Sequence, residues 1–270
     1  MRALADALTK AGVQVDWFRY GPGPGQGRVQ MRADAALQLA DRVLLYRHLA
    51  VNVARAKGLK ASFLPLATEG GATPGFPVHL ALWKDGRNLF HNDAGWSLTS
   101  AVARGCAGGL LAHLPALSAL CAPTTNSYRR LVSGVSGPAG ALLSTTDRKA
   151  ACRIPARSTA PGARRVKFCV PDSTCNPYLA IAAIVMAALD GVEKMMEPPV
   201  DGEAPAPGGV PHCLESALDA LGSDRAFLTA GEVFSPAILD AWTRERWASQ
   251  VIPTRTKPHP AETAEDPKEA

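Results

Sequence analysis

The chain has 270 residues, of which 47% are hydrophobic, and it carries a net charge of +5 with a pI of about 9.0. This apolar content supports a sizeable core and excludes global disorder, and the dispersed basic residues argue against a nucleic-acid platform. The longest apolar run, residues 178–189, is too short to span a membrane, and the N-terminus lacks the apolar core of a signal peptide. None of the six cysteines forms a Cys-x-x-Cys pair, and several lie in apolar runs as reduced core residues would, so we expect a reduced, cytoplasmic protein.

In the first third of the chain, apolar periodicity and turn residues predict a mixture of helices and strands. Asp34 is expected to cap the longest helix and Gly58 to end it. In chain order the predicted elements are a helix at 2–11, strands at 14–19 and 28–33, a helix at 35–57, strands at 61–66 and 77–83, and a turn at 84–86.

The rest of the chain is predicted to be mainly helical. Asn176 and Pro177 provide a cap and a first-turn proline for the helix that follows them. The predicted elements are a helix at 99–120, a strand at 164–170, a helix at 178–196, a loop at 197–211, and two or three helices ending near 251. Because strands and helices do not alternate strictly, we expect an α+β fold on an antiparallel sheet, with one domain at 1–252 and a polar mobile tail at 253–270.

Residues 21–32, GPGPGQGRVQMR, look at first like a glycine-rich phosphate loop. Such a loop binds its anion through backbone N–H groups, and proline has none. Pro22 and Pro24 therefore remove donors, and glycines at every second position match neither the dinucleotide pattern nor a Walker loop. The segment is better explained as a turn between two strands.

Three longer segments point to one protein family. They are ALWKDGRNLF at 81–90, APTTNSYRRLVSG at 122–134 and VPDSTCNPYLAIAAIVMAALDG at 170–191. All three resemble segments of the C-terminal catalytic domain of glutamine synthetases. Shorter motifs follow in the family's order, namely CRIP at 152–155, DRAFLTAGEVF at 224–234 and KPHPAE at 257–262. The chain is identified as a member of this family over nearly its whole length.

The resemblance implies the family's α+β catalytic-domain fold, an antiparallel sheet flanked by helices, without the N-terminal β-grasp domain. In the family, ATP activates the side-chain carboxylate of glutamate as γ-glutamyl phosphate, and ammonia then displaces the phosphate. Two or three Mg²⁺ or Mn²⁺ ions hold the nucleotide and neutralise the transferring phosphoryl group. The active sites lie between subunits of stacked rings, so the implied partner is a second copy of the chain, although the lack of a β-grasp domain argues against such rings.

Aligned with the family motifs, the metal-binding positions carry other residue types. The family's metal ligands fall on Gly21 (or on Tyr20, if the loop is one residue longer), Arg28, Pro77 and Lys167. The flap glutamate, which helps to deprotonate ammonium, falls on Ser136. Hard divalent cations prefer carboxylate oxygens, which none of these positions offers. We therefore expect no intact catalytic group and no tight binding of ATP, Mg²⁺ or Mn²⁺.

The substrate side of the implied site keeps its cations. Arg130 matches the arginine that binds the α-carboxylate of glutamate, and Arg148 matches an arginine at the transferred phosphate. Arg153 and Arg165 match arginines on the nucleotide side, where His79, the second histidine of the family's His-x-His, is also retained. The resemblance thus implies a pocket for glutamate, nucleotide or phosphate that has kept cations and lost carboxylates.

These residues indicate a glutamate–ammonia ligase by family that has lost catalysis, as is thought of the related lens protein lengsin. One alternative is an active γ-glutamyl ligase for ammonia or an amine, completed by a separate β-grasp chain. A second is a non-catalytic homologue, either structural or with Arg28 and Lys167 holding anions in place of metals. A gene remnant without function is the third, and poor soluble expression would support it.

Overall fold

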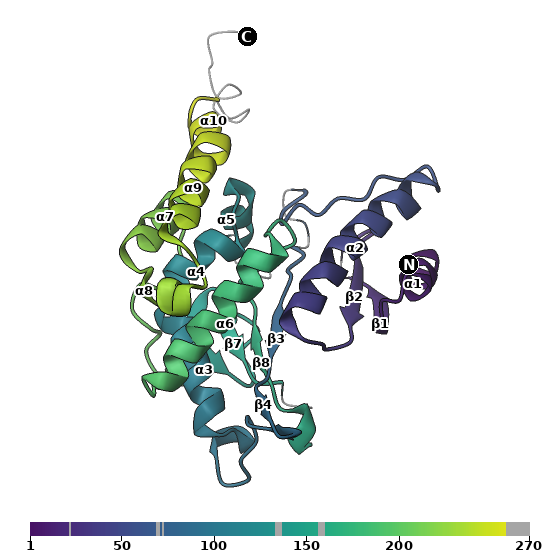
Figure 1. The fold of residues 1–270 in the computed structure, drawn as a ribbon. Helices are drawn as coiled ribbons and strands as arrows, with labels where there is room; N and C mark the ends of the chain where they lie inside the picture. The colour runs from purple at the N-terminus through teal and green to yellow at the C-terminus, as the bar shows by residue number, and fades with distance from the viewer. Residues whose placement is uncertain (22, 69–70, 72, 133–136, 156–159, 258–270) are drawn as a thin grey trace.

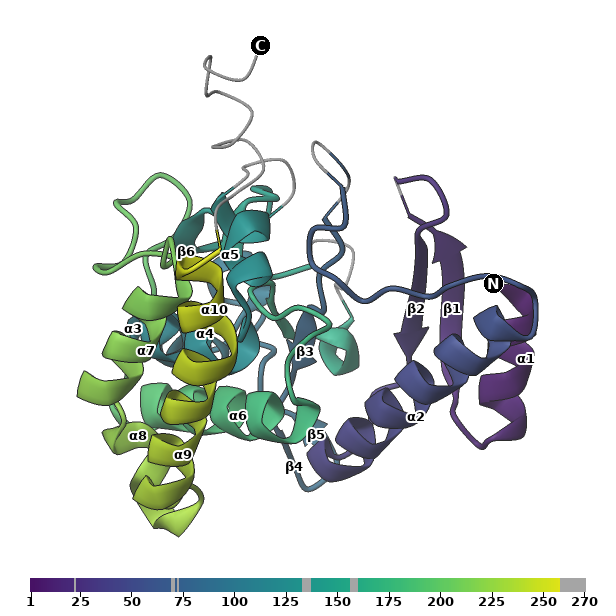
Figure 2. The same ribbon diagram turned by 90° about the horizontal axis from the view of Figure 1, so that it is seen from above.

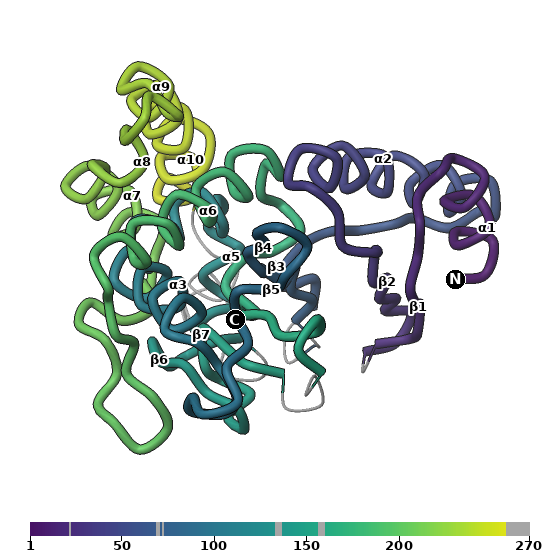
Figure 3. The backbone as a smooth tube through the Cα atoms, turned by 60° about the horizontal axis from the view of Figure 1, so that its bottom comes forward, coloured from purple at the N-terminus to yellow at the C-terminus, as the bar shows by residue number. Residues whose placement is uncertain are grey.

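The computed structural model describes residues 1–21, 23–68, 71, 73–132, 137–155 and 160–257. The chain forms a small N-terminal unit and a larger unit in which helices cover a four-stranded sheet (Figure 1). The N-terminal unit lies on the β3 side of this sheet, as the view from above and the backbone tube also show (Figures 2 and 3).

The N-terminal unit has a small core of its own. Its elements are α1 (Arg2–Lys10), the antiparallel strands β1 (Val15–Tyr20) and β2 (Gly27–Met31), and α2 (Ala36–Arg55). Leu4 and Leu8, one turn apart on α1, pack with Val13 and Ala50. All four elements were predicted from the sequence.

The two ends of α2 differ in how well the sequence predicts them. Ala35, rather than Asp34, is the N-cap residue, and the Asp34 carboxylate accepts a hydrogen bond from the Ala35 N–H at 2.8 Å. At the other end Gly58 has a φ of +68°, which is the left-handed conformation expected where a glycine ends a helix.

The strand predicted at 61–66 is wrong, because these residues have no regular structure. The side-chain amide of Asn126 takes the place of a neighbouring strand. Its Nδ2 donates to the Leu66 carbonyl and its Oδ1 accepts from the Leu66 N–H, both at 2.9 Å. This apolar run is thus held by hydrogen bonds to a distant side chain rather than by pairing with a neighbouring β-strand.

The larger unit is built on a sheet with the strand order β3–β8–β7–β6. The strands are β3 (Val78–Leu80), β6 (Gly140–Ser144), β7 (Ala150–Arg153) and β8 (Val166–Phe168). β8 pairs antiparallel with both β3 and β7, as expected, whereas β6 runs parallel to β7. Both β6 and β7 lie in stretches whose residue pattern did not predict a strand.

The strand predicted at 77–83 is divided. After β3 the chain leaves the sheet and forms a short hairpin of β4 (Trp83–Lys84) and β5 (Arg87–Asn88). Asp85 and Gly86 both have positive φ values, which a two-residue hairpin turn requires, so the predicted turn at 84–86 is confirmed.

The helix predicted at 99–120 is two helices, α3 (Ala101–Ala112) and α4 (Leu114–Cys121), which meet at His113. Pro115 lies in the first turn of α4 and has no N–H with which to continue the hydrogen-bond ladder of α3, which explains the break.

The remaining helices of the described chain surround this pair. They are α5 (Thr125–Val132), α6 (Pro177–Glu193), α7 (Leu214–Ser223), α8 (Ala226–Thr229), α9 (Pro236–Arg246) and α10 (Ile252–Arg255). The Asn176 side chain caps α6 as predicted, accepting hydrogen bonds from the N–H groups of Tyr178 and Leu179. α10 continues past the domain boundary predicted at 252. Among the residues that the structure describes, no helix is long and apolar enough to cross a membrane.

The core lies between the sheet and the closely packed pair α3 and α6. Glycines permit this close approach. A Cβ atom at Gly109 of α3 would collide with the carbonyl oxygen of Ala187, and one at Gly191 of α6 would collide with the carbonyl oxygen of Gly105. These contacts are backbone to backbone, so no side-chain movement can relieve them.

The substitution Gly109→Ala should therefore lower the free energy of unfolding by about 1–3 kcal/mol, the usual cost of overpacking. Gly222→Ala in α7 is the matched control, since a Cβ there has no atom within 4 Å, and it should be neutral or stabilising by about 0.4–1 kcal/mol. Urea unfolding of both variants measures the difference, and equal effects would contradict the packing described for α3 and α6.

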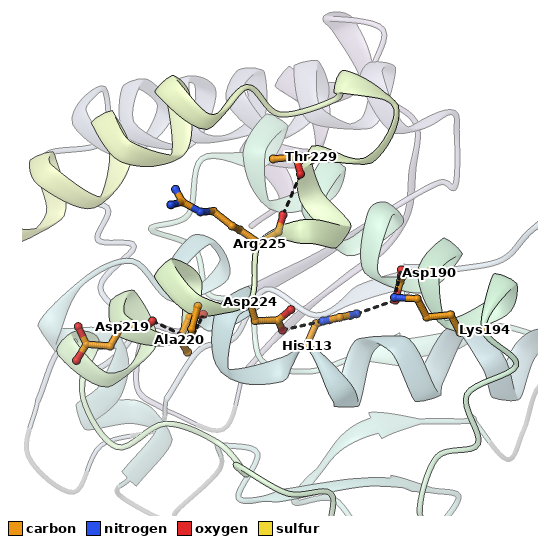
Figure 4. Close-up of polar contacts among 9 residues, drawn as sticks. His113, Asp190, Lys194, Asp219, Ala220, Asp224, Arg225 and Thr229 are labelled. Atoms are coloured by element: carbon orange, nitrogen blue, oxygen red, sulfur yellow. Dashed lines mark hydrogen bonds and ion pairs between the residues drawn. The ribbon is translucent and has the colours of Figure 1, made fainter.

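His113, at the break between α3 and α4, joins three elements through one imidazole (Figure 4). Its Nδ1 lies 2.7 Å from Asp224 Oδ2 after α7, and its Nε2 lies 3.0 Å from Asp190 Oδ2 on α6. The ring stacks on Phe227 of α8, and Lys194 pairs with the other oxygen of Asp190. Burial alone would lower the pKa of His113, but the hydrogen bonds and charges of the two aspartates outweigh it and raise that pKa.

This arrangement makes a pH-dependent contribution to stability. Because the pKa is raised in the folded state, the contribution is complete below the ordinary histidine pKa of about 6.5 and is lost as pH rises through the higher folded pKa. His113→Gln should lower the free energy of unfolding by about 2 kcal/mol at about pH 6, with a smaller effect above pH 8. Urea unfolding across this range, with exposed His48→Gln as control, tests this, and a pH-independent effect would contradict it.

Candidate functional site: a cationic cleft

A cleft of about 1440 Å³ lies between the N-terminal unit and the sheet of the larger unit. Its lining includes every sequence-predicted site residue that the structure describes, and Ser136 lies outside the described residues. The predicted residues in the lining are Gly21, Arg28, Pro77, His79, Arg130, Arg148, Arg153, Arg165 and Lys167. Positions spread over most of the sequence are thus brought to one site.

The lining is strongly cationic. Its basic residues are Arg19, Arg28, Arg47, Lys57, Lys60, Arg130, Arg148, Lys149, Arg153, Arg165 and Lys167. Among its described residues only Asp16 carries a carboxylate, which lies 3.9 Å from the guanidinium of exposed Arg32. Within the described chain, no three His, Cys, Asp or Glu side chains gather as a metal site would need.

One wall of the cleft is a row of three side chains across the sheet. The antiparallel register places His79 on β3 opposite Lys167 on β8, and Lys167 opposite Arg153 on β7. Neighbouring strands are about 4.8 Å apart, so the row covers roughly 10 Å. The Nε of Arg153 is buried and has no hydrogen-bond partner in the described structure.

The opposite wall is the β1–β2 hairpin, where Arg19 lies opposite Arg28. Burial lowers the pKa of Lys167, the Cys169 thiol acts against this, and Arg153, Arg28 and Arg19 lower it further. The pKa of Arg28 is also lowered, by burial and then by Arg19. The charges of the two walls therefore act on each other across the cleft.

His79 is a neutral member of this site. The Arg165 Nε donates to its Nδ1 at 2.9 Å, and the same guanidinium donates through Nη1 to the Ala163 carbonyl at 3.0 Å. Burial, followed by the charges of Lys167 and Arg165, lowers the pKa of His79 to about 4. A neutral imidazole that accepts at Nδ1 fixes the direction of Arg165 without adding charge.

Arg130 shapes the cleft wall from within. It is only 3% exposed, and its Nη1 and Nη2 donate to the carbonyl oxygens of Val170 and Cys169 at 2.8 and 2.9 Å. The guanidinium thereby ties α5 to the chain that follows β8. Its assignment to the glutamate α-carboxylate, like the other roles assigned by resemblance, stays a prediction.

Sequence reasoning missed part of the site. Arg19, Arg47 and Lys149 belong to the lining but match no family motif used in the prediction. Arg19 could have been predicted as a site residue from the sequence, because a hairpin at 14–33 places it close to Arg28. Cys169 also belongs to the lining, and burial raises the pKa of its thiol in spite of nearby Lys167 and Arg153.

Comparison with known proteins decides the family. The model of the glutamine synthetase catalytic domain matches residues 1–265. The chain belongs to the glutamine synthetase family. It is 41% identical over 270 residues to the glutamine synthetase of Frankia alni, covering 96% of this chain and 57% of that protein. It is 39% identical over 250 residues to that of Aquifex aeolicus, covering 88% of this chain and 52% of that protein.

Solved structures agree on the fold. The glutamine synthetase of Plasmodium falciparum superposes with a TM-score of 0.91 at 21% identity, over 98% of this chain and 60% of that one. GmaS without ligand superposes with a TM-score of 0.86 at 27% identity, over 98% and 62%. The chain therefore has the catalytic-domain fold predicted from its motifs, and it spans a little over half the length of the curated relatives it matches.

The electrostatics of the cleft can be checked through His79. Its imidazole resonances should titrate with a pKa of about 4 in NMR spectra, while those of His113 titrate above the ordinary value in the same samples. Lys167→Met should raise the His79 pKa, because it removes one of the positive charges that oppose protonation. A His79 pKa of about 6–7 in the native protein would contradict the described environment.

Proposed function

We propose that this member of the glutamine synthetase family has lost metal-dependent ligase activity and that its cleft binds anions directly. The observation that carries the proposal is the pair Arg28 and Lys167. Both stand at positions that the resemblance assigns to metal-binding glutamates, and the charge of one affects the pKa of the other across the cleft. The site thus has positive charge where the family reaction needs negative charge.

Elementary electrostatics supports the loss of metal binding. A divalent cation about 4 Å from one ammonium group is repelled by roughly 8 kcal/mol at an effective dielectric constant of ~20. Mg²⁺ and Mn²⁺ also need oxygen ligands, and the described cleft offers one carboxylate, that of Asp16, on the exposed hairpin. The residues present do not fit the family's metals, so we derive no phosphoryl-transfer step through them.

The chemistry that remains is anion recognition. Guanidinium groups present planar pairs of donors that match phosphate and carboxylate oxygens, and lysine adds a point charge. In the cleft, Arg153 lies beside Lys167 and Arg165 is oriented by His79. We assign binding of glutamate, nucleotide or phosphate to these cations, as proposals from the resemblance.

The rival proposal is an active ligase whose missing residues come from another polypeptide or from a second copy in a ring. The curated relatives are almost twice as long as the matched segment, which leaves room for such a contribution. This alternative requires that metal still binds, so metal affinity separates the two.

We therefore expect calorimetric titration with Mn²⁺ to show no saturable metal binding by the chain at millimolar concentrations, and a titration with ATP present to show no more than a blank titration of Mn²⁺ into ATP alone. The reason is the repulsion from Arg28 and Lys167, and the double variant Arg28→Glu/Lys167→Glu should gain Mn²⁺ affinity over the native chain. Lys84→Glu, an exposed change on the β4–β5 hairpin, is the matched control and should gain none. Micromolar Mn²⁺ binding by the native chain would overturn the proposal and favour the rival.

A further inference from the structure

The cleft has charge on two facing walls, which restricts the shape of an anion that can satisfy it. We infer that its ligand class is a linear oligophosphate in its metal-free form, bound with phosphates on both walls. This inference rests on the proposed anion-binding function and specifies its ligand.

Positive charge is spread over both walls of the cleft. Lys167 and Arg153 lie side by side on the sheet, and Arg28 and Arg19 lie side by side on the hairpin. Arg148 and Lys149 add two further cations where the chain enters β7. A single phosphate or carboxylate can neutralise one part of this surface and leaves the rest of the like charges facing one another.

The guanidinium donors in the cleft have positions suited to a ligand with several phosphates. Arg153 lines the cleft beside Lys167, and its planar guanidinium presents paired donors that match phosphate oxygens. Arg165 is held by two hydrogen bonds, to His79 and to the Ala163 carbonyl, so its position is set before any ligand arrives. Linked phosphates present oxygens at regular intervals and can accept from several such fixed donors at once.

The cations of the cleft also determine whether Mg²⁺ strengthens or weakens the binding of an oligophosphate. Mg²⁺ neutralises part of the charge of an oligophosphate and competes with the lysine and arginine side chains for its oxygens. In a cleft with carboxylates a metal ion bridges ligand and protein, but here it would bring a third set of positive charges against Lys167 and Arg28. Mg²⁺ should therefore weaken binding, which is the reverse of its role in the family's reaction.

Calorimetric titrations of the native chain in EDTA with inorganic tripolyphosphate and with monophosphate test this inference. Tripolyphosphate should bind at least about tenfold more tightly than monophosphate, and excess Mg²⁺ should weaken its binding by about fivefold or more. Equal affinities for the two anions, or tighter binding in Mg²⁺, would overturn the extended metal-free ligand. Neither result bears on the proposed loss of metal binding, which the Mn²⁺ titration decides separately.

Two charge reversals identify the walls. Arg28→Glu on the hairpin and Lys167→Glu on the sheet should each weaken tripolyphosphate binding at least about tenfold, and Lys84→Glu should leave it unchanged. Because Arg28 is more exposed than Lys167, its variant should keep the native thermal unfolding curve even if the Lys167 variant does not. Native affinity in a folded Arg28→Glu variant would overturn the two-wall arrangement.

Discussion

The pairing of β8 with β3 and β7 is the constraint on which the site depends. Backbone hydrogen bonds fix which residues lie opposite each other, whatever their side chains. The residue types at these positions then decide the sign of the field in the cleft. With His79, Lys167 and Arg153 in one row, the sheet presents a neutral donor–acceptor group and two cations to the β1–β2 hairpin. The ligand chemistry of the site can therefore change while the fold of the family is kept.

The rest of the molecule holds this row in place. Close packing of α3 and α6 through Gly109 and Gly191 supports the sheet from behind. The His113 cluster joins α6 to the chain around α7 and α8, and Arg130 attaches α5 to the carbonyl groups after β8. Each of these contacts is buried or part-buried and joins elements distant in sequence, so the sheet that forms the cleft wall is fixed by the packing of the larger unit.

Much of the fold could be predicted from local signals. The hairpin at 14–33, the capped start of α6 and the turn at 84–86 all follow from residues within a few positions of one another. The failures come from longer-range effects. The Asn126 side chain, rather than a neighbouring strand, forms hydrogen bonds with Leu66 at the end of residues 61–66. The short strands β6 and β7 are extended because they pair within the sheet, which no local pattern predicts. Pro115 could have predicted the helix break at His113, but the continuous apolar pattern of residues 99–120 favoured a single helix.

The candidate site shows the same division. Family motifs identified Arg28, Lys167 and Arg153 one at a time. The strand register shows that Lys167 and Arg153 are neighbours, and the lining of the cleft places Arg28 and Arg19 across from them. The structure also shows that Arg130 is engaged with backbone carbonyls, and that His79 orients Arg165, neither of which spacing along the chain can reveal.

The most direct test of the account is to see which ion occupies the cleft. Crystals soaked separately with Mn²⁺ and with tungstate, a tetrahedral oxyanion of phosphate-like shape, can be compared through the anomalous scattering of each metal atom. The account predicts a tungstate peak within hydrogen-bond distance of Lys167 or Arg28 and no Mn²⁺ peak there. A Mn²⁺ ion between the hairpin and the sheet, with no tungstate, would contradict it.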